Sequence, residues 1–133
     1  MNFCEKISKI AYKNGGDKLQ TYEALAKRQG VAVPTFKRRR DENRLTIKNI
    51  RDMGFDVLLD DGSKLIEFDC RMVFRDFRVG NKLPREEAYA RIGMSYSYGW
   101  EALRQDKVSI IKMANLGVKI LVDGYGEQVE VYG

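Results

Sequence analysis

Four consecutive basic residues are the part of this chain best suited to chemistry with a partner. They are Lys37, Arg38, Arg39 and Arg40, and Arg44 follows one helical turn later. A guanidinium group binds phosphate oxygens and makes bidentate contacts with guanine, so this run favours a nucleic-acid partner. An ordinary solvated face of a helix is the alternative interpretation.

Few other residues are suited to catalysis or to metal binding. The chain has no histidine, which removes the commonest general base and any Ser–His or Cys–His pair. Its two cysteines, Cys4 and Cys70, lie far apart and form no CxxC motif, so a zinc site has too few soft ligands. Turn chemistry next to glycine explains Asp60, Asp61 and Asp123 better than a catalytic carboxylate pair does. We therefore expect no enzymatic activity, no metal site and no cofactor.

The composition is that of a globular protein. The 133 residues are 44% hydrophobic and 32% charged, with a net charge of +5 that suits a polyanion without requiring one. No apolar run is long enough to span a bilayer and the N-terminus has no signal-peptide pattern, so we expect a cytoplasmic protein that does not enter a membrane. Both thiols are expected to be buried or semi-buried and reduced, and a disulfide between them is the alternative.

An internal repeat positions these residues. A shift of 63 positions superposes identical residues without a gap, and such self-similarity indicates a duplicated structural unit. The identical pairs are Glu23 and Glu86, Arg28 and Arg91, Gly30 and Gly93, Ile47 and Ile110, Gly54 and Gly117, Leu58 and Leu121, Asp60 and Asp123, and Glu67 and Glu130. We expect two units, residues 1–68 and 69–133, which pack on each other because a unit of roughly 65 residues is marginal alone.

Hydrophobic periodicity predicts the same element order in both units, four helices and then a β-hairpin. The fold class is therefore expected to be α+β, mostly α. The helices of the first unit are expected from Phe3 to an end at 14–16, from an N-cap near Thr21 to Arg28, around Pro34 to Arg40, and from Ile47 to Met53, with strands at 55–59 and 65–68. Those of the second unit are expected from Cys70 to a stop at Gly80-Asn81, from Pro84, from an N-cap at Ser95 to Leu103, and from Ile110 to Leu116, with strands at 118–122 and 129–131. The hairpins are expected to join into one sheet, which would pair edges that are otherwise exposed.

The first unit resembles the helix-turn-helix of the phage repressor and Cro family. The residues that carry the resemblance are Leu25, Ala26, Gly30, Val31, Ala32, Thr35, Phe36 and Arg38, and the second unit carries the motif more weakly. The resemblance implies that the third helix of each unit enters the major groove of double-stranded DNA while the second crosses the backbone. The hairpins are similar to those of Cro-type proteins and of some antitoxin repressors, where they help to form the dimer. Two units in one chain would then make an intrachain pseudo-dimer.

The resemblance also assigns roles to residues. The outer face of the third helix is expected to read bases in this family, with phosphate contacts around it. The positions that match in the first unit are Val33, Pro34, Lys37 and Arg38, with Lys37, Arg40 and Arg44 suited to phosphates. The positions that match in the second unit are Tyr96, Ser97, Trp100 and Glu101, and Arg104 completes the DNA-binding candidates.

The second unit departs from the family pattern in ways that leave its role open. Gly99 lies inside its third helix at a cost of about 1 kcal/mol relative to alanine. Tyr96, Tyr98 and Trp100 occupy positions where a DNA-reading helix usually carries polar residues, and Trp100 suits an exposed position as well as a core position. Glu101 opposes a phosphate backbone unless it accepts from cytosine. The second unit is thus a degenerate DNA reader or a protein-binding face.

Two functions follow from these residues. The first is a sequence-specific transcriptional regulator, a repressor of phage or mobile-element type, which reads two half-sites on DNA. The alternative is a protein-interaction or inhibitor protein, such as an anti-CRISPR, which binds a nucleic-acid-handling machine through the second unit. An antitoxin-like repressor would combine the two, and two chains could pair further into a homodimer.

Overall fold

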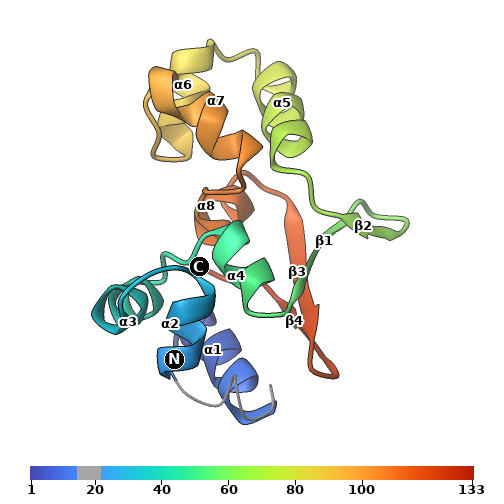
Figure 1. Ribbon diagram of the computed structural model, residues 1–133. Helices are drawn as coiled ribbons and strands as arrows, with labels where there is room; N and C mark the ends of the chain where they lie inside the picture. Colours follow the sequence, from blue (N-terminus) through green and yellow to red (C-terminus); the bar gives the residue numbers. More distant parts are fainter. Residues whose placement is uncertain (15–21) are drawn as a thin grey trace.

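The computed structural model describes residues 1–14 and 22–133, and the expected N-cap at Thr21 and the stop at Gly15-Gly16 lie outside these ranges. The fold is α+β, with helices around one four-stranded antiparallel sheet (Figure 1). In Figure 1, α4 and α8 lie near the middle of the molecule, with α1–α3 below them and α5–α7 above them. The sheet extends to one side of this helical column.

The two halves repeat one series of elements at matching positions. The first half contains α1 (Phe3–Asn14), α2 (Tyr22–Arg28), α3 (Val33–Asp41), α4 (Ile47–Asp52), β1 (Asp56–Asp60) and β2 (Leu65–Glu67). The second half contains α5 (Cys70–Gly80), α6 (Arg85–Arg91), α7 (Tyr96–Arg104), α8 (Ile110–Ala114), β3 (Lys119–Gly124) and β4 (Glu127–Glu130). The bounds of α6 and α7 equal those of α2 and α3 shifted by 63 residues, so the predicted order and offset of the elements are confirmed.

Local sequence explains where several helices begin and end. Thr46 caps α4, since its hydroxyl accepts from the amide of Asn49 at 3.1 Å while the Asn49 side chain accepts from the amide of Thr46 at 3.0 Å. Ser95 stands at the N-cap of α7 as predicted, yet its side chain makes no capping hydrogen bond. The left-handed residue after α5 is Lys82, with a φ of 53°, rather than a glycine.

The two hairpins do join into one sheet, with the strand order β2-β1-β3-β4. The central pair, β1 and β3, is antiparallel, and Leu58 pairs with Leu121, its own equivalent in the other half. A bridge between Thr46 and Ser109 again joins equivalent positions. On either side of it, Ile47 N–H donates to the Val108 carbonyl at 3.0 Å and Ile110 N–H donates to the Leu45 carbonyl at 3.2 Å. Each half therefore offers the same backbone surface to the other.

One hydrophobic core runs through both halves. Val57 and Leu59 on β1 and Ile120 and Val122 on β3 point from the same sheet face into this core. The core continues into each group of three helices, through Leu25 and Phe36 in the first half and Phe74 and Ile92 in the second. Cys4 and Cys70 are buried in it as free thiols, so the alternative of a disulfide between them is wrong in this structure.

The other face of the sheet is acidic. Period-2 alternation places on it every second residue of the four strands. Its charged members are Asp56, Asp60, Glu67, Lys119, Asp123 and Glu130, with Leu58 and Leu121 half-buried between them. Negative charge thus gathers on the side of the sheet that faces away from the core.

Candidate nucleic-acid interface

Helix α3 presents one exposed stripe that contains three of the predicted DNA-binding residues, Pro34, Lys37 and Arg38. Pro34, Lys37, Arg38 and Asp41 are exposed at the spacing i, i+3, i+4, i+7, which defines one face of a helix. Phe36 on the opposite face is fully buried and fixes the rotation of α3. Lys37 and Arg38 therefore point away from the core, whereas Val33, another predicted base contact, is half-buried and packs against the core.

The turn before α3 needs a glycine. Gly30 adopts a φ of 68° between α2 and α3, and its equivalent Gly93 adopts 71° between α6 and α7. The amide of the residue that follows Gly30, Val31, donates to the carbonyl of Ala26 at 3.1 Å, which closes the turn onto α2. This turn sets the direction in which α3 leaves α2.

The predicted phosphate ligands Arg40 and Arg44 are engaged within the fold. The side chain of Arg40 is 14% exposed and forms an ion pair with Asp41 at 2.8 Å. Its guanidinium carbon lies 4.5 Å from the centre of the Tyr22 ring, a cation–π contact. Arg44 is half-exposed and pairs with the carboxylate of Glu42, to which its Nε donates at 2.9 Å. Among the described residues, Lys37 and Arg38 form no ion pair, and Lys37 Nζ lies 5.7 Å from the centre of the Tyr22 ring.

Helix α7 presents the equivalent stripe with different chemistry. The positions that match Pro34, Lys37, Arg38 and Asp41 at the 63-residue offset are Ser97, Trp100, Glu101 and Arg104. Trp100 is 59% exposed and Tyr98 is 72% exposed, so these aromatic side chains lie on the surface rather than in the core. Tyr96 is also exposed, with its ring edge-on to that of Tyr89 at 5.9 Å.

A local ion pair partly neutralises the end of this stripe. Arg104 Nε donates to Glu101 at 3.2 Å, and a second, shorter contact joins the same two groups. This hydrogen bonding lowers the pKa of Glu101 and raises the pKa of Arg104. The guanidinium of Arg104 also lies 6.0 Å from the centre of the Trp100 ring. The guanidinium that lies over the exposed indole is therefore already paired with Glu101.

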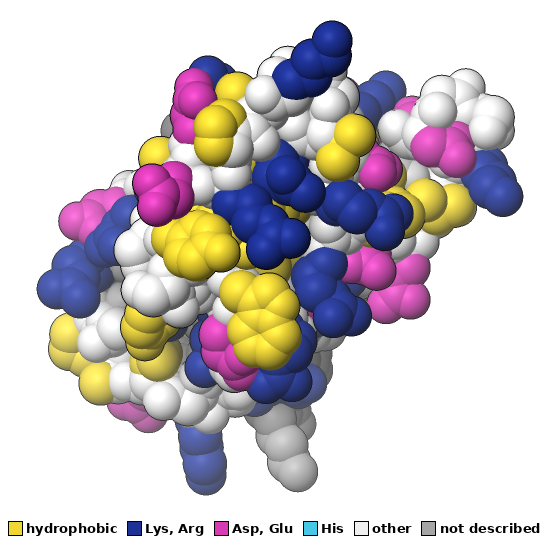
Figure 2. All heavy atoms as spheres, turned by 90° about the horizontal axis from the view of Figure 1, so that it is seen from above, with side chains coloured by type: hydrophobic (Ala, Val, Ile, Leu, Met, Phe, Trp, Pro, Cys, Tyr) yellow, Lys and Arg dark blue, Asp and Glu magenta, His cyan; other side chains and the backbone are white. Residues whose placement is uncertain are grey.

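The sequence interpretation missed a row of arginines on α5. Arg71, Arg75 and Arg78 are spaced i, i+4, i+7, on the side of the helix away from the buried Val73. Together with Arg85 at the start of α6 and with Trp100, they line an open groove of about 610 Å³, here called the arginine groove. Figure 2, which views the molecule from above α5–α7, shows Lys and Arg side chains gathered beside hydrophobic ones. The helical spacing of the three arginines was visible in the sequence and would have predicted this surface.

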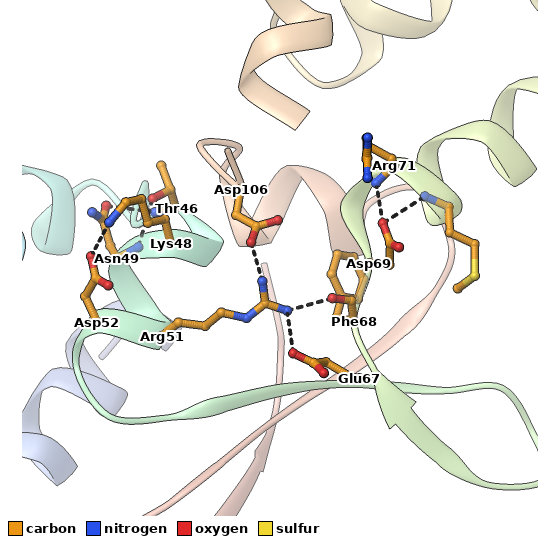
Figure 3. A network of polar contacts seen from close by, with 11 residues as sticks. Thr46, Lys48, Asn49, Arg51, Asp52, Glu67, Phe68, Asp69, Arg71 and Asp106 are labelled. Carbon is orange, nitrogen blue, oxygen red and sulfur yellow. Dashed lines mark hydrogen bonds and ion pairs between the residues drawn. The ribbon is translucent and has the colours of Figure 1, made fainter. Parts of the chain in front are cut away.

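A polar contact between the halves anchors the C-terminal end of α7. Asp106, two residues beyond α7, accepts from Arg51 of the first half, and the same guanidinium donates to the Phe68 carbonyl at 2.6 Å (Figure 3). The carbonyl of Asp106 accepts from the amide of Lys48 at 2.9 Å. Asp106 has a left-handed φ of 57°, as does its equivalent Asn43 at 58°. The position of α7 is therefore tied to α4 as well as to its own half.

Comparisons of this chain with protein-family models, with curated proteins and with solved structures find no match. Among the described residues, no three or more acidic, cysteine or histidine side chains gather in a way that would hold a metal ion. In the same part of the chain, no helix has the length and apolar character that crossing a membrane requires.

Proposed function

We propose that this protein is a sequence-specific, double-stranded-DNA-binding regulator of phage or mobile-element type, built as a tandem pair of helix-turn-helix units in one pseudo-dimer. The observation that carries the proposal is the pairing of Leu58 with Leu121 and of Thr46 with Ser109. Contacts between equivalent positions are those a two-fold axis produces. These contacts support a pseudo-two-fold arrangement of the two units. In such an arrangement α3 and α7 would present equivalent faces to two half-sites about one DNA turn apart.

The distribution of charge supports the same choice of surface. Lys37 and Arg38 project from α3, while the open face of the sheet carries five carboxylates against one lysine. A polyanion is repelled by that sheet face and attracted to the helices. Arg38 suits a bidentate contact with guanine, and Lys37 suits a phosphate. The operator expected from unequal units is an imperfect palindrome.

The test is selection of bound duplexes from a random pool, followed by fluorescence anisotropy over a salt series. The proposal expects an enriched two-part motif and a steep loss of affinity with salt. Arg38→Ala should weaken the selected site by about 1–3 kcal/mol and relax one base position. Lys64→Ala, which removes the same charge from the exposed β1–β2 turn, is the matched control. A pool with no enriched motif, or equal effects of the two substitutions, would refute the proposal.

A protein partner for α7 is the second candidate function, favoured by the exposure of Tyr98 and Trp100. An inhibitor of a nucleic-acid-handling machine, such as an anti-CRISPR, would use this face. The cores of protein–protein interfaces are enriched in tryptophan and tyrosine. Glu101, which occupies the position of Arg38 in the first unit, would in addition repel a phosphate backbone. Trp100→Ala separates the candidates, because unchanged duplex affinity in this variant would show that α7 does not read DNA.

A further inference from the structure

The arginine groove concentrates positive charge with little local compensation. Asp69, the carboxylate that lines the groove, accepts from the backbone amides of Arg71 and Met72 at 3.0 and 3.2 Å, as the N-cap of α5. Asp76 lies 3.8 Å from Arg75, and both side chains are largely exposed. Within the described residues, the ion pairs involve Arg51, Arg75, Arg91 and Arg104 in this region but none of Arg71, Arg78 and Arg85. These guanidinium groups therefore keep their capacity for an anionic ligand.

The opposite side of the groove is aromatic. Phe74 and Tyr89 stack with ring centres 4.7 Å apart and close the groove on the core side. Trp100 on α7 lines the same groove and leaves more than half of its surface to solvent. The space where a side chain of residue 99 would begin is filled by Tyr89, so α6 supports α7 directly beside the indole. A flat ligand thus finds a supported π surface beside a row of cations.

The dimensions suit a short stretch of a polyanionic chain. Arg71 and Arg78 are seven residues apart, or about 10 Å along the helix axis. A volume of about 610 Å³ lies in the range of sites that hold a drug-sized ligand. Duplex DNA hides the faces of its bases, so it cannot use the indole. A phosphopeptide offers phosphate without a regular series of phosphates and bases.

We propose that the arginine groove binds single-stranded nucleic acid, with backbone phosphates on Arg71, Arg75, Arg78 and Arg85 and a base stacked on Trp100. Aromatic stacking combined with a basic groove is the way proteins hold single strands with little regard to sequence. This activity goes beyond duplex recognition: the groove shares Trp100 with the α7 face, and α3 contributes nothing to it. Single-stranded DNA and RNA both offer phosphates and unstacked bases, and the titration below compares the two.

The single tryptophan of the chain makes the contact directly measurable. The full-length protein is titrated with twelve-nucleotide oligo(dT), oligo(U), an abasic strand of equal length and a duplex, and the Trp100 emission is recorded. Saturable quenching by either base-bearing strand, stronger than that by the abasic strand, supports the proposal. The ratio of the affinities for oligo(dT) and oligo(U) shows whether the groove prefers DNA or RNA. Equal affinity for the abasic strand, or quenching by the duplex alone, overturns it.

Substitutions then locate the site, with anisotropy of a labelled single strand as the readout. Trp100→Ala should weaken binding by about 5- to 160-fold, whereas Tyr98→Ala, at an exposed aromatic that does not line the groove, should not. Arg78→Ala should weaken binding more than Lys64→Ala does at equal net charge. Arg38→Ala should leave single-strand affinity unchanged, so failure of duplex recognition and failure of this proposal are distinguishable. Equal effects within either matched pair would refute the assignment of the groove.

Discussion

The ring of Tyr89 occupies the position that a Cβ on Gly99 would need. The equivalents of these residues in the first half are Ala26 and Phe36, both buried, so the large and the small side chain have exchanged helices. A glycine that looks like a defect within a helix is therefore one half of a complementary pair. The exchange lets Tyr89 stack on Phe74 and support α7.

Gly99→Ala is expected to destabilise the protein although alanine favours helices. The added methyl group meets the ring of Tyr89, which is held by Phe74, and overpacking of this kind costs about 1–3 kcal/mol. Urea unfolding measures the change. Gly80→Ala is the control, because its new Cβ would meet nothing within 4 Å. In a Tyr89→Ala background the cost of Gly99→Ala should vanish, and an undiminished cost there would contradict the pairing.

The shared sheet and core predict that both halves unfold in one transition. Leu25→Ala, a substitution deep in the first half, should cost about 2–5 kcal/mol. The unfolding midpoint measured by the fluorescence of Trp100, which lies in the second half, should then shift. The midpoint measured by far-UV circular dichroism should shift by the same amount. A tryptophan transition that stays in place while the dichroism transition moves would show that the halves unfold separately.

Asp106→Asn tests the contact between α7 and α4 without straining the backbone. Asparagine tolerates the left-handed conformation and is the residue found at the equivalent position 43. Loss of the carboxylate should cost about 1 kcal/mol, near the upper end for a partly exposed ion pair. Glu67→Gln is the control, since that carboxylate is largely exposed and lies 4.0 Å from the same Arg51. Equal midpoints for the two variants in urea would contradict a structural role for Asp106.

The buried thiols of Cys4 and Cys70 should make the folded state less stable at alkaline pH. Burial raises the pKa of Cys4 from 9.0 to about 11, and burial followed by the charge of Asp106 raises the pKa of Cys70. The folded state therefore favours the protonated thiol. Its contribution is complete below pH 9 and is lost as the pH rises toward 11. Urea midpoints at a series of pH values measure this fall, and constant midpoints between pH 8 and 11 would contradict it.

The same burial protects both thiols from modification. At pH 8 the thiolate fraction of Cys4 in the folded protein should be about 100-fold below that of an ordinary cysteine. Disulfide-exchange reagents should label the native protein far more slowly than the protein in guanidinium chloride. Labelling at equal rates in both conditions would show that the thiols are accessible.

Much of the fold could be predicted because the duplication gives two sequences for each helix and strand. Gly30 and Gly93 mark the same turn, and Ile47 and Ile110 begin the same helix, so errors in one unit are corrected by the other. The left-handed conformation of Lys82 could not be predicted in this way. It depends on how the chain turns between α5 and α6, a tertiary constraint that a lysine does not indicate.

The site was less predictable because it depends on contacts between elements. Arg40 has the composition of a phosphate ligand, yet it packs on Tyr22, a residue 18 positions earlier in the chain. The arginines of α5 lie outside the helix-turn-helix motif, so the resemblance assigns them no role. Their combination with Trp100 exists only once α5 and α7 are packed around Tyr89.

The Leu58–Leu121 pairing lies within one chain, and dilution cannot separate its two sides. A regulator assembled from two identical chains must first associate, so its occupancy of a site depends steeply on its cellular level. For the proposed DNA-binding function, this chain avoids that step, and occupancy of a two-part site follows a simple hyperbola in protein concentration. The expected response is graded, without a threshold, and each half is free to acquire its own specificity.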